Sequence, residues 1–451
     1  MSLFRNILLS KNDKKLLFIN NFIIFALLLI NQINQKMSLY EEQSKSWSPL
    51  IRVLFKFTFS YFTLFVILLF LAPFLEIPLR WFAENILNWG GDFHMESTGS
   101  GDRSFDYVRL ALNIILAAVV SVIWSLKNNE KMSYYRWHYW FQVILRVFLF
   151  AAMMLYGLVK VFKGQFSDAG LELLLQPVGE MSPMGLAWTF MGHSMMYNIF
   201  LGVVEVFGGI LLLNRKTVTF GSFVIMGIMA NVFMMNLAYD VPVKLFSFHL
   251  LLMSLILFIV DWNRIKQVFF KNETTEKVAY FTPKLNKPFE RLIKGGKGLV
   301  KILITVIIAV QCFVQFDLRE QLKEKSDLYG IWETQIFVKN RDTLKPILTD
   351  DFQWRYLIVD SKNKAAVKKM NETFDRYNFQ FSDKPNQLIF LKEEDSLEQH
   401  FSFQFKDSKE LSLNGVLKGD TISVYFKRKP KSDFRLINRG FHWVNESTYN
   451  Y

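Results

Sequence analysis

Ionisable residues lie inside apolar stretches of this sequence, where a charge is costly. Glu205 stands within Gly202-Val-Val-Glu-Val-Phe-Gly-Gly209, and Arg146 and Lys160 interrupt an earlier apolar stretch. A charged side chain inside a membrane is expected to be paired or to line a polar cavity, and it commonly marks a functional site. At about 1.5 Å of helical rise per residue, Glu205 and Arg146 would lie about 13 Å and 8 Å from one membrane surface, and Lys160 about 28 Å. We therefore expect Arg146 to be the partner of Glu205.

Further polar side chains collect in the half of these stretches that is remote from that surface. They are Lys160, His193, Asn198, Asn231, Asn236 and His249, at about 20–31 Å by the same count. Asn198 and Glu205 are seven residues apart and share a helix face. The pattern permits a polar cavity that narrows toward Glu205 and could take a small ligand or a quinone headgroup. The alternative is structural, because Asn side chains hydrogen-bond between helices and Lys160 can extend to the interface.

Other kinds of chemistry have little support in the sequence. Two histidines and one carboxylate on three helices lack the spacing of metal ligands, so we expect no metal site. Cys312 is the single cysteine, which excludes an intrachain disulfide and a multi-cysteine redox centre. We find no nucleotide-binding loop, hydrolase triad or haem motif.

The elements that would position these residues are membrane-spanning helices. The chain has 451 residues, of which 51% are apolar, 16% aromatic and 21% charged. Apolar blocks that alternate with polar ones are typical of a multi-pass membrane protein, in which each span needs about 20 residues. We predict seven spans, at 53–75, 107–126, 141–162, 190–213, 217–238, 243–262 and 299–316.

The net charge of +13 is a topology signal. The excess of basic residues lies in residues 1–36 and 263–316 and forms no basic face with interleaved aromatics, so we expect no nucleic-acid partner. Lysine and arginine are enriched in cytoplasmic loops, and the loops on one side hold seventeen of them against four on the other. This predicts a plasma-membrane protein with a cytoplasmic amino end and with everything after Phe316 outside. The lysines of 263–298 either contact anionic lipids or are the ordinary excess of a cytoplasmic loop, and we favour the second reading.

Residues 1–36 do not fit this topology. Leu16–Ile30 is apolar but has only about 15 residues, which is short for a span. One interpretation is that Met37 is the true start, and the other is an interfacial or signal-anchor helix.

After the last predicted span the pattern changes to short strands. The runs are Trp332–Val338, Trp354–Val359, Arg376–Phe381, Leu388–Leu391, Phe401–Phe405, Leu411–Leu417 and Thr421–Phe426. About eight strands predict an all-β barrel or sandwich over residues 317–451, because closure removes exposed strand edges. Gly330-Ile-Trp332 resembles the G-x-W opening of lipocalin-like barrels. The alternative is a generic β-domain with a buried tryptophan.

Residues 141–262 resemble the DoxX family of four-helix membrane proteins. Leu155-Tyr-Gly-Leu-Val-Lys160 matches the family's G-x-x-K at the end of its first helix, and Glu205-Val-Phe-Gly-Gly-Ile-Leu-Leu-Leu-Asn-Arg-Lys-Thr217 resembles its E-x-x-G-G-x-L-L-L-x-x-R-x-T block. Relatives include a subunit of thiosulfate:quinone oxidoreductase and membrane partners of redox-defence complexes. The resemblance implies a DoxX-like bundle and a quinone-linked role for Glu205 and Lys160. The chain departs from the family in its extra helices, its β-domain and its lack of cysteines for sulfur chemistry.

We therefore expect an extension at 1–36, a helical membrane domain at 37–316 and an extracytoplasmic β-domain at 317–451. The first functional hypothesis is a membrane subunit of a quinone-linked redox complex. Glu205 and Lys160 would be its catalytic residues, and Arg146, His193, Asn198 and His249 would contact the quinone. The alternative is a non-enzymatic anchor whose β-domain binds an apolar ligand or an envelope partner. A transporter is disfavoured because we find neither an inverted repeat nor paired broken helices.

Overall fold

The chain folds into two compact units in a computed structural model. The first is formed by Met1–Leu158 and Phe200–Ala309, and the second by Val159–Ile199 and Val310–Tyr451. The structure describes residues 47–89, 99–127, 134–276, 302, 305–310, 312–314, 316–317, 325–392 and 398–449. The expected extension at 1–36 lies outside these residues.

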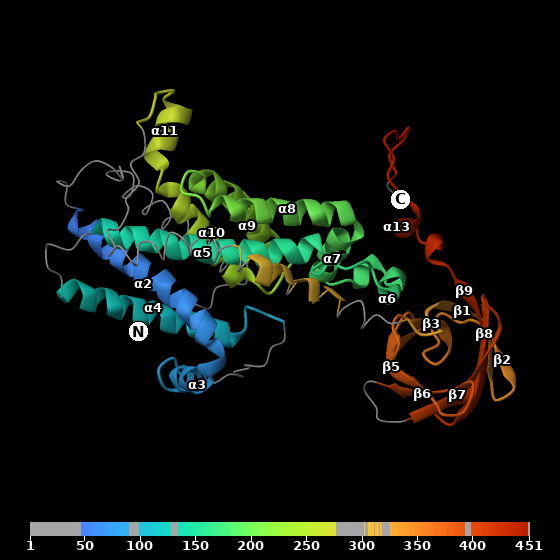
Figure 1. Cartoon of the computed structure of the whole chain (residues 1–451). Helices are drawn as coiled ribbons and strands as arrows, with labels where there is room; N and C mark the ends of the chain where they lie inside the picture. The colour runs from blue at the N-terminus through green and yellow to red at the C-terminus, as the bar shows by residue number, and fades with distance from the viewer. Residues whose placement is uncertain are drawn as a thin grey trace. The chain divides into compact units, whose positions relative to one another are not determined.

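The first unit is helical (Figure 1). Its described helices are α2 (Pro49–Leu71), α3 (Glu76–Asn85), α4 (Ser104–Leu126), α5 (Tyr134–Val161), α8 (Met195–Leu211), α9 (Val218–Ala238), α10 (Lys244–Ile259) and α11 (Trp262–Phe270). Within the described residues, α2, α4, α5 and α9 are each long and apolar enough to cross a membrane, and the count rises to six if each of two bent helix pairs forms one span. The expected span at 299–316 falls partly outside the described residues, and its part at 305–310 is helical.

Breaks in the helices fall within two of the predicted spans, 190–213 and 243–262. The stretch from 183 contains α7 (Pro183–His193) and α8, which meet at an angle of 95°. Ser194 between them is extended, and the Asn198 side chain donates to the carbonyl oxygens of Met191 (2.7 Å) and Ser194 (3.0 Å), which ties the end of α7 to the start of α8. Likewise α10 and α11 meet at 69°, so the helix predicted over 243–262 ends early.

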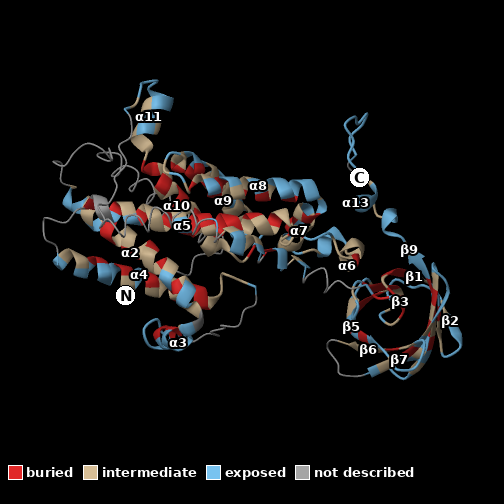
Figure 2. Cartoon of the chain, in the orientation of Figure 1, coloured by how far each residue is buried: buried red, intermediate tan, exposed pale blue. Residues whose placement is uncertain are grey.

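Glycines bring α8 close to its neighbours. A β-carbon on Gly157 of α5 would lie 2.8 Å from the carbonyl oxygen of Gly202, and one on Gly209 would lie 3.0 Å from the β-carbon of Met153. On the α9 side, a β-carbon on Gly221 would lie 2.7 Å from that of Leu211. Small residues permit such approach between helices. Figure 2 shows the opposite, exposed face of α8 and the buried positions on α5.

The β-domain is a closed antiparallel barrel with one extra strand, which confirms the predicted strand-rich domain. The strands are β1 (Gly330–Lys339), β2 (Asp342–Leu344), β3 (Trp354–Val359), β4 (Lys364–Lys369), β5 (Phe374–Phe381), β6 (Gln387–Lys392), β7 (Glu398–Asp407), β8 (Glu410–Leu417) and β9 (Asp420–Lys429). The order is β2-β1-β3-β4-β5-β6-β7-β8-β9, and β1 also pairs with β9, so eight strands close the barrel and β2 extends from β1.

Large side chains fill the barrel. Trp332, Trp354, Phe390 and Phe401 are each 1–2% exposed. The indole nitrogen of Trp332 donates to the carbonyl oxygen of Leu328 at 2.8 Å, which satisfies its polar group. A ligand-sized cavity would leave accessible surface on the residues that line it. The barrel interior around these residues is therefore a packed core, as eight strands allow.

A segment from between α5 and α7 packs on the outside of the barrel. Helix α6 (Leu171–Leu175) places Leu171, 1% exposed, against Ile331, Tyr356 and Ile358. Polar contacts hold both ends of α6, because Asp360 accepts from the Leu171 amide at 3.3 Å and Lys368 Nζ donates to the Leu175 carbonyl at 2.7 Å. This segment and the barrel therefore form one unit.

A half-buried carboxylate links three strands of the same domain. Asp375 on β5 pairs with Lys369 on β4 at 2.8 Å and with Lys392 on β6 at 3.2 Å. Burial raises the pKa of Asp375, but the hydrogen bonds and charges of the two lysines lower it more, so its pKa lies below the usual range.

Candidate functional site

Glu205 lies at the closest approach of α5 and α8. Its side chain is 3% exposed. A β-carbon on Gly157 would lie 3.1 Å from the Glu205 β-carbon, so the two helix backbones are nearly in contact there. A carboxylate held among apolar helices is costly, and such residues are rare unless they serve a function. Glu205, which was selected from the sequence, is thus deeply buried in the structure.

Tyr156 belongs to the same site and was not selected from the sequence. It precedes Gly157 on α5, its hydroxyl is within electrostatic reach of Glu205, and its ring lies 6.1 Å from that of Phe246 on α10. A phenol and a carboxylate give the α5–α8 crossing both a hydrogen-bond donor and an acceptor. Tyrosine is ordinary in an apolar helix, and only the proximity to Glu205 singles this one out.

The two cations that the sequence analysis selected are both on α5. Arg146 Nε donates to the carbonyl oxygen of Leu212 at 2.8 Å, just after the end of α8. Arg146 therefore binds the segment that ends the helix of Glu205, and its pairing with the carboxylate itself stays a prediction. Lys160, in the last turn of α5, is only 6% exposed, so its side chain is enclosed by protein rather than extended toward solvent.

His193 and Asn198 flank the bend between α7 and α8. His193 is exposed at the end of α7, whereas Asn198 is completely buried. The two bonds that Asn198 donates to Met191 and Ser194 give it a structural task at the bend. Its role as a ligand contact is a separate prediction.

His249 lies in a second polar cluster, between α10 and α2. Its Nε2 is 2.6 Å from the hydroxyl of Tyr61, its Nδ1 is 2.6 Å from the carbonyl oxygen of Leu245, and its ring stacks on Phe65 at 4.0 Å. The carbonyl can only accept, so Nδ1 carries the proton, and a neutral ring then accepts at Nε2 from Tyr61. His249 is thereby fixed in one tautomer.

Charged residues missed by the sequence analysis surround the start of α4. Asp106, 2% exposed, pairs at 3.0 Å with Arg103 and at 3.0 Å with Arg109. Asn113, two turns further along the same face of α4, donates to the Tyr61 carbonyl at 3.3 Å. A cavity of about 10 Å³, the size of one water, lies beside Asp106, Arg109 and Asn113. A sequence count places Asp106 and Arg109 at the edge of a predicted span, where charges are common, so nothing marked them as buried.

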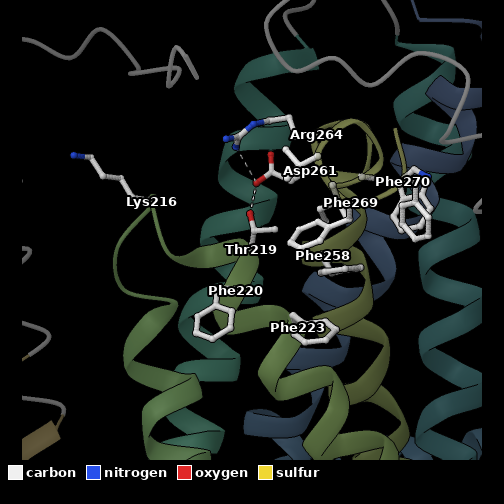
Figure 3. Close-up of a pocket in the computed structure, with 12 residues that line it drawn as sticks. Lys216, Thr219, Phe220, Phe223, Phe258, Asp261, Arg264, Phe269 and Phe270 are labelled. Atoms are coloured by element: carbon white, nitrogen blue, oxygen red, sulfur yellow. Dashed lines mark hydrogen bonds and ion pairs between the residues drawn. The ribbon is translucent and has the colours of Figure 1, made fainter. Parts of the chain in front are cut away.

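A larger groove opens at the other end of α9 and α10 (Figure 3). Its volume is about 620 Å³. It is lined by Lys216, Thr219, Phe220, Phe223, Phe258, Asp261, Trp262, Arg264, Ile265, Val268, Phe269 and Phe270. Asp261 accepts a hydrogen bond from Thr219 and pairs with Arg264 at 3.7 Å. The groove is apolar with polar groups at one edge, as ligand sites commonly are.

Comparison with known proteins gives one informative match. The chain is 33% identical over 124 residues to the "Uncharacterized protein YwoB" of Bacillus subtilis (strain 168). The match covers 28% of this chain and 79% of that protein. No protein-family model matches the chain, and no solved structure matches it. Among the described residues, no group of three or more His, Cys, Asp or Glu side chains is placed to hold a metal ion.

Proposed function

We propose that this chain, which belongs to the same protein family as the uncharacterized YwoB of Bacillus subtilis, is the membrane subunit of a quinone-linked redox complex. In this proposal the helical unit lies in the plasma membrane, and a quinone headgroup binds beside Glu205. The observation that carries the proposal is the burial of Glu205 at the α5–α8 crossing, with the Tyr156 hydroxyl within electrostatic reach.

The outer face of α8 supports a membrane location. Phe200, Val203 and Phe207 follow one face of the helix and are 59%, 51% and 48% exposed. Contiguous exposed apolar residues are rare on proteins in water, but lipid chains cover such a face without cost. The positive-inside count then places the α8–α9 turn in the cytoplasm.

The contact of α6 with the barrel supports the prediction that the loop after α5 and the β-domain lie on the same side of the membrane. The sequence analysis placed both the loop after α5 and the β-domain outside. Because Leu171 is buried against Ile331 and Ile358, the loop and the β-domain must lie on the same side of any membrane. The count of charged loops and this contact are independent of each other, and they agree.

A quinone suits the chemistry of the Glu205 site. A quinone carbonyl accepts hydrogen bonds, and its reduction takes up protons as well as electrons. Tyr156 can donate to such a carbonyl, and Glu205 can accept or deliver a proton at that place. In this proposal Arg146, on the same helix as Tyr156, offsets the negative charge, and electrons come from a partner subunit.

Quinone binding by the full chain in lipid nanodiscs tests the proposal. Glu205→Gln keeps the size of the side chain and removes its charge. Hydrogen bonds to charged groups contribute about 1.5–3 kcal/mol, so we expect a loss of affinity of about tenfold or more. Glu84→Gln makes the same change at an exposed position on α3 and should leave binding unchanged. Equal affinities for the Glu205→Gln and Glu84→Gln proteins, both folded, would refute the role of Glu205.

The second candidate is a binding module, and one feature of the barrel favours it. The rings of Phe381 and Phe403 lie 5.8 Å apart, and those of Phe403 and Phe405 lie 5.9 Å apart. Phe381 and Phe405 are 46% and 38% exposed at the ends of their strands. The three rings share the inward faces of their strands with the buried Phe379 and Phe401, so this half-exposed aromatic cluster lies at one end of the packed interior. It is where an envelope partner would bind. Cross-linking with the full chain should lose such a partner in Phe381→Ser and keep it in Val178→Ser.

A further inference from the structure

The groove of Figure 3 is built from a corner between two helices and the start of a third. Phe220 and Phe223 come from the first turns of α9, Phe258 comes from the end of α10, and Trp262 and Phe269 come from α11. Aromatic side chains from all three helices therefore line it. Its volume of about 620 Å³ is within the roughly 300–1,000 Å³ of small-molecule sites.

Helix α11 has the pattern of a helix that lies in a membrane interface. Trp262, Ile265 and Phe269 recur at helical spacing and line the groove, and Arg264 and Lys266 lie between them in the sequence. Two of the apolar residues that line the groove are open to the surroundings, since Phe269 and Phe270 are 78% and 71% exposed. A short helix that carries Trp, Phe and basic residues is typical of segments that bind at the boundary of headgroups and acyl chains.

The charge at the rim of the groove is positive. Lys216, in the turn before α9, and Arg264 are its two cations, and Asp261 is its one acid. Thr219 and Arg264 already satisfy the Asp261 carboxylate. Lys216 points away from the rings in Figure 3. An occupant with an apolar body and an anionic end would match both parts of the groove.

We propose that this groove binds an anionic phospholipid, with one acyl chain between α9 and α11 and the phosphate at Lys216. The rings supply a surface that an acyl chain covers, and the rim supplies a cation where the headgroup begins. The lipid would hold α11 against the bundle. This site differs from that of Glu205 and does not depend on quinone binding.

A brominated lipid tests both parts of the proposal, because bromine on an acyl chain quenches a tryptophan that it touches. The full chain, purified in neutral detergent and stripped of lipid, is titrated with brominated phosphatidylglycerol and with brominated phosphatidylcholine. We expect tighter binding of phosphatidylglycerol. Trp262→Phe should lose the saturable part of the quenching, since the other tryptophans lie outside the groove lining.

The charge contact is tested by Lys216→Gln, with Lys384→Gln on an exposed β-domain turn as the matched control. One basic residue near an anionic headgroup contributes about 1 kcal/mol, so the affinity for phosphatidylglycerol should fall about fivefold in the first variant and not in the second. Arg264 is left intact because its removal would free Asp261. Equal affinities for the two lipids, saturable quenching that survives in Trp262→Phe, or binding of glycerol phosphate as tight as that of the lipid would each overturn the proposal. Glu205→Gln should bind the lipid normally, which separates this result from that of the proposed function.

Discussion

Gly157 offers a quantitative test of the α5–α8 crossing. In Gly157→Ala the new β-carbon would lie 2.8 Å from the carbonyl oxygen of Gly202, 2.8 Å from Val206 Cγ2 and 3.1 Å from the β-carbon of Glu205. Distances under 3.0 Å force something to move, and a backbone carbonyl cannot rotate away as a flexible side chain can. The crossing must therefore open at the place where Glu205 sits.

The size of the effect follows from two opposing terms. Alanine is about 1 kcal/mol more favourable than glycine inside a helix. Overpacking a tight contact costs about 1–3 kcal/mol. Gly227 on α9 supplies the first term alone, because a β-carbon there would meet nothing within 4 Å. We therefore expect Gly227→Ala to be stabilised by up to about 1 kcal/mol and Gly157→Ala to be about 1–3 kcal/mol less stable than it.

The assay is unfolding of the full chain in bicelles, followed by far-ultraviolet circular dichroism, for wild type and both variants. The comparison between the two alanine variants cancels the helix propensity. If Gly157→Ala is as stable as Gly227→Ala, the helices are not in contact at Gly157 and the described site is incorrect.

Three further results are expected. Tyr61→Phe leaves Nε2 of His249 without its donor and should cost about 1–3 kcal/mol, and a double-mutant cycle should show a much smaller cost in the His249→Phe background. Leu171→Ala removes a side chain that is fully buried against the barrel and should lower the free energy of unfolding by about 2–5 kcal/mol. Val178→Ala, at an exposed position, should shift the free energy of unfolding by less than about 0.5 kcal/mol. The pKa of Asp375 is lowered in the folded state, so its contribution to stability is present above the unfolded pKa of about 4 and is lost as pH falls through the folded pKa. Acid titration followed by tryptophan fluorescence should therefore show that the β-domain loses stability as pH falls. In Asp375→Asn the stability should depend less steeply on pH.

Hydropathy predicted the long helices well but missed the breaks. α2, α4, α5 and α9 each overlap a predicted span over most of its length. Next to the bend at Ser194 the chain makes a close tertiary contact, since a β-carbon on Gly192 would lie 2.1 Å from the carbonyl oxygen of Ser167. Such a contact leaves no mark in an apolar run. The bend before α11 was in principle visible, because Asn263–Gln267 is polar.

In the β-domain, the alternation of apolar and polar residues predicted those strands whose sequences alternate. Phe401-Ser-Phe-Gln-Phe405 lies in β7 as predicted. β4, with the sequence Lys-Ala-Ala-Val-Lys-Lys, was not recognised because alanine and lysine have low strand propensity, and its pairing with β3 and β5 imposes the extended form. Closure into a barrel rather than a sandwich depends on the β1–β9 pairing, which no local pattern encodes.

The sequence predicts a residue of the candidate site only where a charged side chain, which is costly to bury, stands in the middle of an apolar helix. Glu205 is conspicuous because a carboxylate in the middle of an apolar helix has few innocuous explanations. Tyr156 and Tyr61 have unremarkable types, and only the packing of α5 on α8 and of α2 on α10 reveals their polar partners. Distances along single helices could not supply this, because helix rotation and register between helices are set by side-chain packing.

The most direct test of the proposed quinone site is an infrared difference spectrum of the full chain in lipid nanodiscs, recorded on addition of a quinone. If the headgroup binds beside Glu205, the spectrum will contain a carboxyl band that is absent in Glu205→Gln and unchanged in Glu84→Gln. A spectrum without a carboxyl change, or one in which the band persists in Glu205→Gln, would contradict the account.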